Sequence, residues 1–254
     1  MTADPVLDVR DLRRHFDGVA AVDGVSLAIH PGEVLGVIGS NGSGKTTLVN
    51  AITGFCRPAS GRVWLRGRDI TGRPVSEVAR LGVGRTFQNL RLFEDMTGLE
   101  NVLAGLLGRT GIGFWQSVTP AGRKDAASRA QVMRTLDLLG IGHGAHVKVK
   151  ALSHGDRRRV EVARALVADP VLLILDEPSA GLTSEETGDL VGALRGLRDV
   201  NSAVLLIEHN LTVVDRLADR VIVMHSGAAI AAGALSDVLA EPAVRSQYMG
   251  LDDG

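Results

Sequence analysis

The segment Gly39-Ser40-Asn41-Gly42-Ser43-Gly44-Lys45-Thr46 has the residue types and spacing of a cradle for anions. It matches the pattern G-x-x-x-x-G-K-[ST] at each fixed position. Glycines let successive backbone N–H groups turn toward phosphate oxygens, and a following helix adds the partial positive charge of its N-terminus. In this chemistry Lys45 reaches the β- and γ-phosphates of a nucleotide, and the Thr46 hydroxyl ligates Mg²⁺. The alternative is a Gly/Ser-rich turn with a chance lysine.

A second pair of chemically capable residues, Asp176-Glu177, follows the apolar run 171–175. A carboxylate at the end of a buried strand is costly unless it meets a cation. In open parallel sheets, ligands bind at the carboxyl ends of the strands. We therefore expect Asp176 to face a Mg²⁺ ion and Glu177 to polarise an attacking water. The alternative is a strand-end acid that caps the next helix.

Three single residues are further candidates. His209 follows the apolar run 203–207, where it would donate to the γ-phosphate or order the attacking water. Gln88 stands where a strand gives way to helical sequence, and a metal ligand or a water-positioning group fits there. Phe16 heads a turn, where it would stack on a purine face. For each a structural role stays open: a packed histidine, a solvated loop glutamine and a core aromatic.

The elements that position these residues follow from the apolar pattern. The run 34–38 predicts a buried strand that feeds the glycine-rich loop, and apolar residues at helical spacing predict a helix after it that stops at Gly54. Buried strands of the parallel type are predicted at 171–175, 203–207 and 221–224, with a helix over 184–197. Alternation predicts strands at 7–10, 25–29 and 62–67, and a further strand begins at 82 and runs into a loop at Gln88.

Residues 91–152 have a different character. Thr97 and Glu100 form a capping-box pattern, and two apolar stripes predict helices over 99–107 and 126–139. A Gly-rich excursion separates them, and a helix over 156–168 follows. The sequence predicts a helical subdomain over 91–152, inserted in an α/β core made of 1–90 and 153–254.

Composition excludes several classes of protein. The net charge of -1 gives no field that attracts nucleic acid or anionic lipid. No apolar run approaches the ~18 residues of a membrane span, and the N-terminus has no pattern of a secretory signal. Cys56 is the only cysteine, which fits a reducing compartment. We expect a soluble cytoplasmic protein.

Taken together, these motifs resemble those of ABC-type ATPase domains. The phosphate loop, Gln88, Leu152-Ser153-His154-Gly155-Asp156, Asp176-Glu177 and His209 stand in the order and approximate spacing of that family, over nearly the whole chain. The middle segment is similar to the signature loop, usually L-S-G-G-Q, from which His154 and Asp156 depart.

A narrower resemblance points to the ATPases of branched-chain and other hydrophobic amino-acid importers, where L-S-Y-G-Q-Q-R-R-x-E-x-A-R-A-L is usual. Four further segments are similar to that subset: 85–93, 180–182, 207–210 and 241–250. The long excursion over 108–125 favours the larger of the two paired ATPases of these importers.

The resemblance implies a fold and a set of roles. The fold would be an α/β P-loop NTPase (RecA-like) core with a mixed antiparallel β-subdomain and the inserted helical subdomain. ATP and Mg²⁺ would be the cofactors. Catalysis would fall to Glu177 as general base, His209 at the γ-phosphate and Gln88 as sensor of the γ-phosphate and Mg²⁺. The metal would be held by Thr46, Gln88 and Asp176. Nucleotide-binding residues would be Phe16, Gly39, Asn41, Gly42, Ser43, Gly44, Lys45, Thr46, Thr47, Ser153 and Gly155.

The same resemblance implies partners. Ser153 and Gly155 would act on the nucleotide of the opposite subunit, so the competent unit would be a dimer with an identical or companion cassette. A transmembrane permease and, indirectly, a solute-binding protein would complete the importer, with the chain peripheral on the inner face of the membrane. Beside Gln88, the side chains of Leu90, Leu92 and Phe93 would dock a permease helix or, alternatively, belong to the helical core.

Two departures qualify the resemblance. Thr183 stands where the family carries Asp or Asn, and Asp156 replaces the usual glutamine. A carboxylate beside a triphosphate is unfavourable unless it is neutralised, and Arg157 or Arg158 is the expected cation. We expect a modest cost and retained activity.

Other functions stay open at this point: ATPases of urea or amide uptake or of lipopolysaccharide export, ABC ATPases acting on ribosomes or DNA, and a binding-only regulatory module. Ribosome- and DNA-acting relatives usually carry two tandem cassettes or a long coiled coil, whereas this chain has one cassette and no basic patch. The transported solute is set by the permease and its binding protein.

Overall fold

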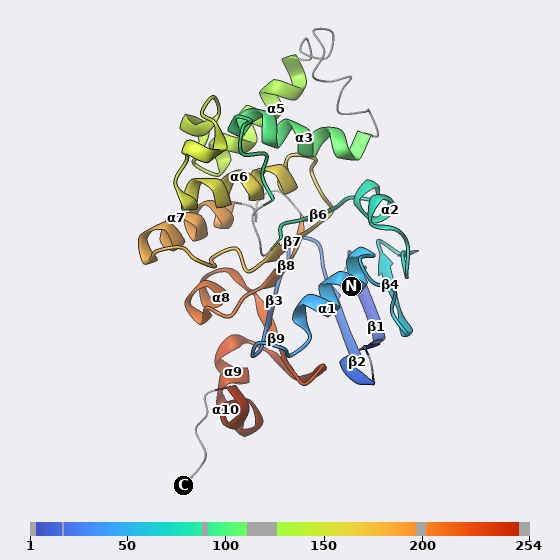
Figure 1. Ribbon diagram of the computed structural model, residues 1–254. Helices are drawn as coiled ribbons and strands as arrows, with labels where there is room; N and C mark the ends of the chain where they lie inside the picture. Colours follow the sequence, from blue (N-terminus) through green and yellow to red (C-terminus); the bar gives the residue numbers. More distant parts are fainter. Residues whose placement is uncertain (1–3, 17, 88–90, 111–125, 197–201, 249–254) are drawn as a thin grey trace.

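The computed structural model describes residues 4–16, 18–87, 91–110, 126–196 and 202–248. Within them a six-stranded sheet runs through the middle of the molecule, with a four-stranded sheet on one side and most of the helices on the other (Figure 1). In the part of the chain described, no helix is both long enough and apolar enough to cross a membrane.

The six-stranded sheet has the order β10-β9-β3-β8-β7-β6, and all neighbours are parallel except β10 and β9. Its strands are β3 (Val34–Ile38), β6 (Val83–Arg85), β7 (Leu172–Asp176), β8 (Ala203–Ile207), β9 (Arg220–His225) and β10 (Ala228–Gly233). The predicted buried strands are therefore confirmed. The strand predicted from residue 82 is short, because its pairing with β7 ends at Arg85. Gln88, where this strand was predicted to run into a loop, lies outside the described residues.

The second sheet is antiparallel, in the order β2-β1-β4-β5. It consists of β1 (Leu7–Phe16), β2 (Val19–Ile29), β4 (Ser60–Leu65) and β5 (Arg68–Asp69). These strands confirm the small sheet predicted from alternation, and β5 adds a short edge strand.

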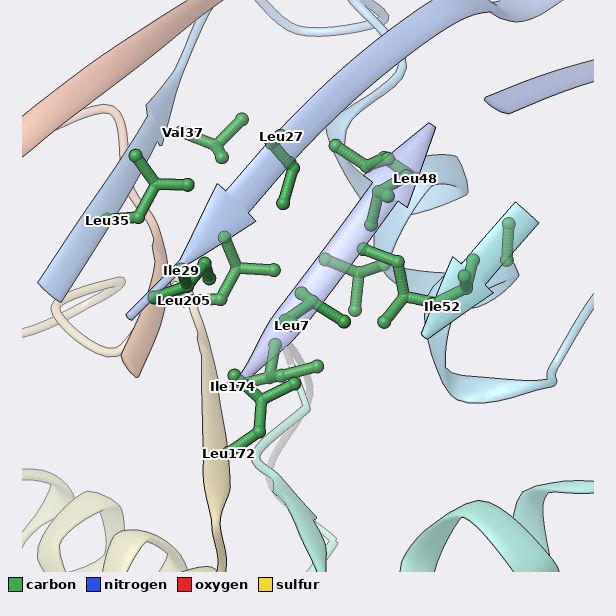
Figure 2. Close-up of a cluster of buried hydrophobic side chains, with 14 of the residues drawn as sticks. Leu7, Leu27, Ile29, Leu35, Val37, Leu48, Ile52, Leu172, Ile174 and Leu205 are labelled. Carbon is green, nitrogen blue, oxygen red and sulfur yellow. The ribbon is translucent and has the colours of Figure 1, made fainter. Parts of the chain in front are cut away.

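Alternation along β7 separates two hydrophobic layers. Leu172 and Ile174 face the antiparallel sheet, together with Leu48 and Ile52 of α1 (Lys45–Thr53) (Figure 2). Leu173 and Leu175 face the helices on the opposite side. Helix α1 is thus packed between the two sheets, which fixes the loop that precedes it.

The helices that cover the other face are α3 (Gly98–Thr110), α5 (Ala126–Leu138), α6 (His154–Leu166) and α7 (Ser184–Arg195). The predicted capping box is present, because Thr97 N–H donates to Glu100 and Glu100 N–H donates to Thr97 Oγ1. Helix α6 packs on both α3 and β7, and the predicted boundaries at residues 90 and 153 stay a prediction. The excursion predicted after α3 falls largely in 111–125, outside the described residues.

Several short helices have no counterpart in the sequence prediction. They are α2 (Val75–Arg80), α8 (Leu211–Leu217), α9 (Leu235–Ala240) and α10 (Pro242–Tyr248), with two 3₁₀ turns at Gly142–Gly144 and Val149–Ala151. The last two helices lie beside β9 and β10 at the C-terminal end of the molecule (Figure 1).

Candidate nucleotide-binding site

Four neighbouring parallel strands bring the predicted residues to one edge of the central sheet. β3 leads into the glycine-rich loop, β8 leads to His209, and β7 ends at Asp176. β6, at the end of this row, leads toward Gln88, which lies outside the described residues. Because the strands are parallel, their carboxyl ends share this edge, as in other open α/β sheets that bind ligands.

The loop before α1 can be built only with glycine at two of its positions. At Gly44, with φ 101°, a Cβ would lie 2.1 Å from the carbonyl oxygen of Ala21. At Gly39 a Cβ would lie 2.3 Å from the carbonyl oxygen of Met224. The sequence pattern therefore reflects close backbone packing as well as anion binding. Asn41, Gly42 and Thr46 are exposed along the same loop and first helical turn.

Lys45 is buried, and its ammonium group bridges its own loop. Its Nζ donates to the carbonyl oxygens of Gly39 at 2.7 Å and Ser40 at 2.9 Å. Burial lowers the pKa of Lys45, and the nearby carboxylates of Glu177 and Asp176 act in the opposite direction. The lysine therefore lies within electrostatic reach of both acids that the sequence singled out.

Asp176 is held from two sides. Its N–H donates to Thr86 Oγ1 at 3.0 Å, and its Oδ2 accepts from Arg85 Nη2 at 2.9 Å. Glu177 follows with φ 47°, a conformation that is uncommon for a side chain other than glycine. Its N–H donates to the carbonyl oxygen of Ile207. The chain thus turns sharply after β7 and sets Glu177 beside the end of β8.

His209 and Glu177 face each other at this edge. His209 Nδ1 lies 4.0 Å from Glu177 Oε1 and 4.0 Å from Glu208 Oε2. Glu208 is fully buried and accepts from the N–H of Ser179 and the N–H of His209. It ties the turn after β7 to the turn after β8, which fixes the spacing of His209 and Glu177.

The residues present fit a Mg²⁺ ion that arrives with phosphate. In the described ranges no group of three or more His, Cys, Asp or Glu side chains forms a metal site by itself. Mg²⁺ is usually bound by one or two carboxylates together with substrate phosphates and water. An exposed Thr46 hydroxyl beside Lys45, and Asp176 in the same electrostatic neighbourhood, provide such hard oxygen ligands.

Ser153 and Gly155 lie at the start of α6, where no described hydrogen bond or ion pair joins them to the phosphate loop. Ser153 Oγ accepts from the N–H of Asp156 and caps the helix. The N–H of Gly155 donates to Glu186 Oε1 at 3.1 Å. Glu186 also forms a capping box with Thr183 at the start of α7, so the unusual threonine serves as an N-cap.

The cation expected beside Asp156 is a different one. Asp156 pairs with Arg159 at 2.8 Å and with His143 at 3.3 Å. Arg157 instead donates to backbone carbonyl oxygens, and Arg158 pairs with Glu161 at 2.9 Å. The expectation that Arg157 or Arg158 neutralises Asp156 is therefore wrong. On a helix that starts at His154, residue 159 lies one turn above residue 156, and residue 158 lies on the buried face.

Phe16 is 44 % exposed at the end of β1. The Arg14 guanidinium carbon lies 4.4 Å from the centre of its ring. The role of Phe16 in stacking on a purine stays a prediction, and such a purine would use the ring face that Arg14 does not cover.

Three residues at the site escaped the sequence analysis: Arg85, Glu186 and Glu208. Glu208 stands at the end of an apolar strand, the same signal that singled out Asp176. Arg85 forms a hydrogen bond with Asp176, 91 positions away in the chain, and Glu186 forms one with Gly155, 31 positions away. No local sequence pattern indicates such contacts.

Comparison with known proteins gives a consistent set of relatives. The family model described as ABC transporter matches residues 22–180. The branched-chain amino acid transport ATP-binding protein LivG of Escherichia coli is 38% identical over 98% of this chain and 99% of that protein. BraF of Pseudomonas aeruginosa, with the same description, is 38% identical over 97% of this chain and 98% of its own. Among solved structures, MJ1267 in its ADP conformation, an ATP-binding cassette of an ABC transporter, superimposes with TM-score 0.85 at 32% identity and covers 98% of this chain and 100% of its own.

Proposed function

Because the chain belongs to the ABC transporter family, we propose that it is the ATP-hydrolysing subunit of an importer for branched-chain or other hydrophobic amino acids. The observation that carries the proposal is the shared sheet edge, where the glycine-rich loop, Asp176-Glu177 and His209 meet. The names of the relatives LivG and BraF support the class of solute.

The site has the parts that phosphoryl transfer to water needs. The loop N–H groups and Lys45 bind the triphosphate, and Thr46 and Thr47 at the start of α1 complete that end of the site. Mg²⁺ held by Thr46, Asp176 and Gln88 would neutralise charge on the β- and γ-phosphates. Glu177 accepts a proton from the attacking water. His209, whose Nδ1 lies 4.0 Å from Glu177 Oε1, contacts the γ-phosphate. Catalysis then rests on positioning and charge.

The competent unit is a dimer of cassettes, identical or paired with a companion. In it Ser153 and Gly155 contact the nucleotide of the opposite subunit. Both residues lie at the N-terminus of α6, where the helix end favours a negatively charged ligand, which supports this arrangement. The N–H of Gly155 is engaged by Glu186 in the single chain, so this contact changes when the nucleotide of the partner arrives.

A groove beside β6 suits a permease helix. Its volume is about 480 Å³, and its lining includes Arg85, Phe87, Phe93, Gly105 and Arg164. Phe93 is half exposed, which favours its proposed docking role. Leu92 packs against the helical cluster, which favours the core alternative for it, and Leu90 lies outside the described residues. Docking here would hold the chain at the inner face of the membrane, with a solute-binding protein as an indirect partner and no nucleic acid.

Purification with the partners attached tests the proposal. Tagged protein with Glu177→Gln, which should trap the ATP-bound dimer, is isolated from native membranes in mild detergent. Two permease subunits, a second ATPase and an amino-acid binding protein are the expected companions. Recovery of ribosomes, nucleic acid or no membrane component would overturn the transport assignment. A permease for urea, amides or lipopolysaccharide would replace only the solute.

A further inference from the structure

We propose that Arg85 is a positioning residue that orients the Asp176 carboxylate for Mg²⁺. This inference rests on the proposed function, because Asp176 must be the carboxylate that supports the metal. Neither the sequence motifs nor the resemblance gives Arg85 a role.

Arg85 and Asp176 form a buried ion pair. Their side chains are only 8% and 3% exposed, and Arg85 Nη2 lies 2.9 Å from Asp176 Oδ2. The pair joins two adjacent strands, since β6 and β7 lie in parallel register with Arg85 opposite Ile174. A buried carboxylate requires such a partner. Engagement of Oδ2 fixes the rotamer of Asp176, and the other carboxylate oxygen is the one we assign to the metal.

The guanidinium is itself fixed by further contacts. Its Nη1 donates to Asn50 Oδ1 at 2.8 Å and to Thr53 Oγ1 at 3.0 Å, both on α1. Its carbon lies 5.2 Å from the ring centre of Phe55 and 5.1 Å from that of Phe87. Arg85 therefore connects the end of the phosphate-loop helix to the carboxylate at the end of β7. A guanidinium that donates to Asp176 through one nitrogen and to two α1 side chains through another, and that packs against two rings, is not replaced by lysine without loss.

The same residue reaches the groove. Arg85 and Phe87 both line the cavity proposed for the permease helix. An occupant of that groove would contact Arg85, which donates to Asp176, and Phe87, whose ring packs against the Arg85 guanidinium. The position of the occupant would therefore affect the orientation of the Asp176 carboxylate. Groups that orient metal ligands from outside the coordination sphere are typically worth 10–100-fold in metal affinity.

The experiment compares Arg85→Met, Arg85→Lys and wild type by binding and by rate. Fluorescent ADP is titrated in EDTA and again across Mg²⁺ concentrations, and ATPase rates are measured over the same Mg²⁺ range. We expect binding in EDTA within about twofold of wild type. For Arg85→Met, the Mg²⁺ concentration for half-maximal nucleotide tightening and half-maximal rate should rise about tenfold or more. The half-maximal Mg²⁺ concentration of Arg85→Lys should lie between those of wild type and Arg85→Met. Saturating Mg²⁺ should restore much of the ATPase rate of both variants.

Arg62→Met is the matched control, because it breaks an exposed arginine–aspartate pair of 3.1 Å between β4 and β5 of the antiparallel sheet. It should leave the Mg²⁺ dependence unchanged. A wild-type Mg²⁺ dependence in Arg85→Met would overturn the inference, and so would equal losses of binding with and without Mg²⁺, which indicate a purely structural role. Failure of the ATPase assignment, the part of the proposed function on which this inference rests, is distinguishable, because wild type itself would then neither bind nor hydrolyse ATP. Failure of the transport assignment alone would change the partners recovered from membranes and leave this comparison unaffected.

Discussion

Arg158 and Glu161 form an ion pair of 2.9 Å on α6 whose side chains are 2% and 1% exposed. Together they hold both backbone polar groups of Phe87. Arg158 Nη1 donates to the carbonyl oxygen of Phe87, and the N–H of Phe87 donates to Glu161 Oε1. Helix α6, whose N-cap is Ser153, is thereby tied to the residue before Gln88. A shift of α6 would consequently move the backbone that enters the segment proposed to sense the γ-phosphate.

Glu161→Ala should destabilise the protein strongly. The substitution breaks a buried ion pair by removing one of its two charges, which typically costs about 3–5 kcal/mol. Chemical denaturation measures the change in the free energy of unfolding. As the matched control, Glu77→Ala breaks the exposed i,i+4 pair of Arg73 and Glu77, where about 0.3–0.5 kcal/mol is expected. Similar losses of unfolding free energy for the two variants would contradict the view that burial makes the Arg158–Glu161 pair important for stability.

The fold could be predicted from sequence where burial leaves a local pattern. β7 and β8 are buried along their whole length, so they appear as continuous apolar runs. β10 was missed because its sequence, Ala-Ala-Ile-Ala-Ala-Gly, consists mostly of alanine, with Ile230 as its only β-branched residue and no aromatic residue. α8 was missed because its seven residues are too few to establish a helical period.

The candidate site divides in the same way. Lys45, Asp176 and His209 were predictable because each belongs to a short motif that begins at the end of a buried apolar strand. The contacts that orient them were not, since Arg85 meets Asp176 across two strands and Glu186 meets Gly155 across two helices. Such pairs depend on tertiary packing, and a residue type alone does not specify them.

Asp156→Gln should increase ATPase rate or ATP affinity, by less than about tenfold. The native carboxylate is unfavourable near a triphosphate, but the ion pair with Arg159 at 2.8 Å offsets part of its charge. A tenfold change corresponds to ~1.4 kcal/mol and sets the upper limit that we expect. Steady-state kinetics and nucleotide titration measure both quantities. If the rate and the affinity were both unchanged, the carboxylate would have no influence on the nucleotide.

Glu186 should stabilise the folded protein in a pH-dependent way. Hydrogen bonds from the backbone of Thr183 and of Gly155 lower the pKa of Glu186. Because the folded-state pKa is depressed, its contribution is present above the unfolded value of about 4.3 and is lost as pH falls through the lower folded value. The stability difference between wild type and Glu186→Ala should therefore be present at pH 7 and shrink in that acidic range. Glu185→Ala, in the same helical turn, is the control, and an equal pH dependence there would contradict the assignment.

Glu177→Gln should abolish most hydrolysis while nucleotide binding persists. The amide keeps the size of the side chain but cannot accept the proton of the attacking water, and general base catalysis is typically worth about 10²–10⁴ in rate. ATP binding should stay close to wild type, because Lys45 and the loop are untouched. His209→Ala should also slow hydrolysis, since His209 lies 4.0 Å from the same carboxylate. Phosphate release measures the rate of hydrolysis, and size-exclusion chromatography in the presence of ATP measures dimerisation. A fast Glu177→Gln variant would move the role of general base to another group, whereas loss of ATP binding would show that Glu177 acts in the nucleotide pocket itself.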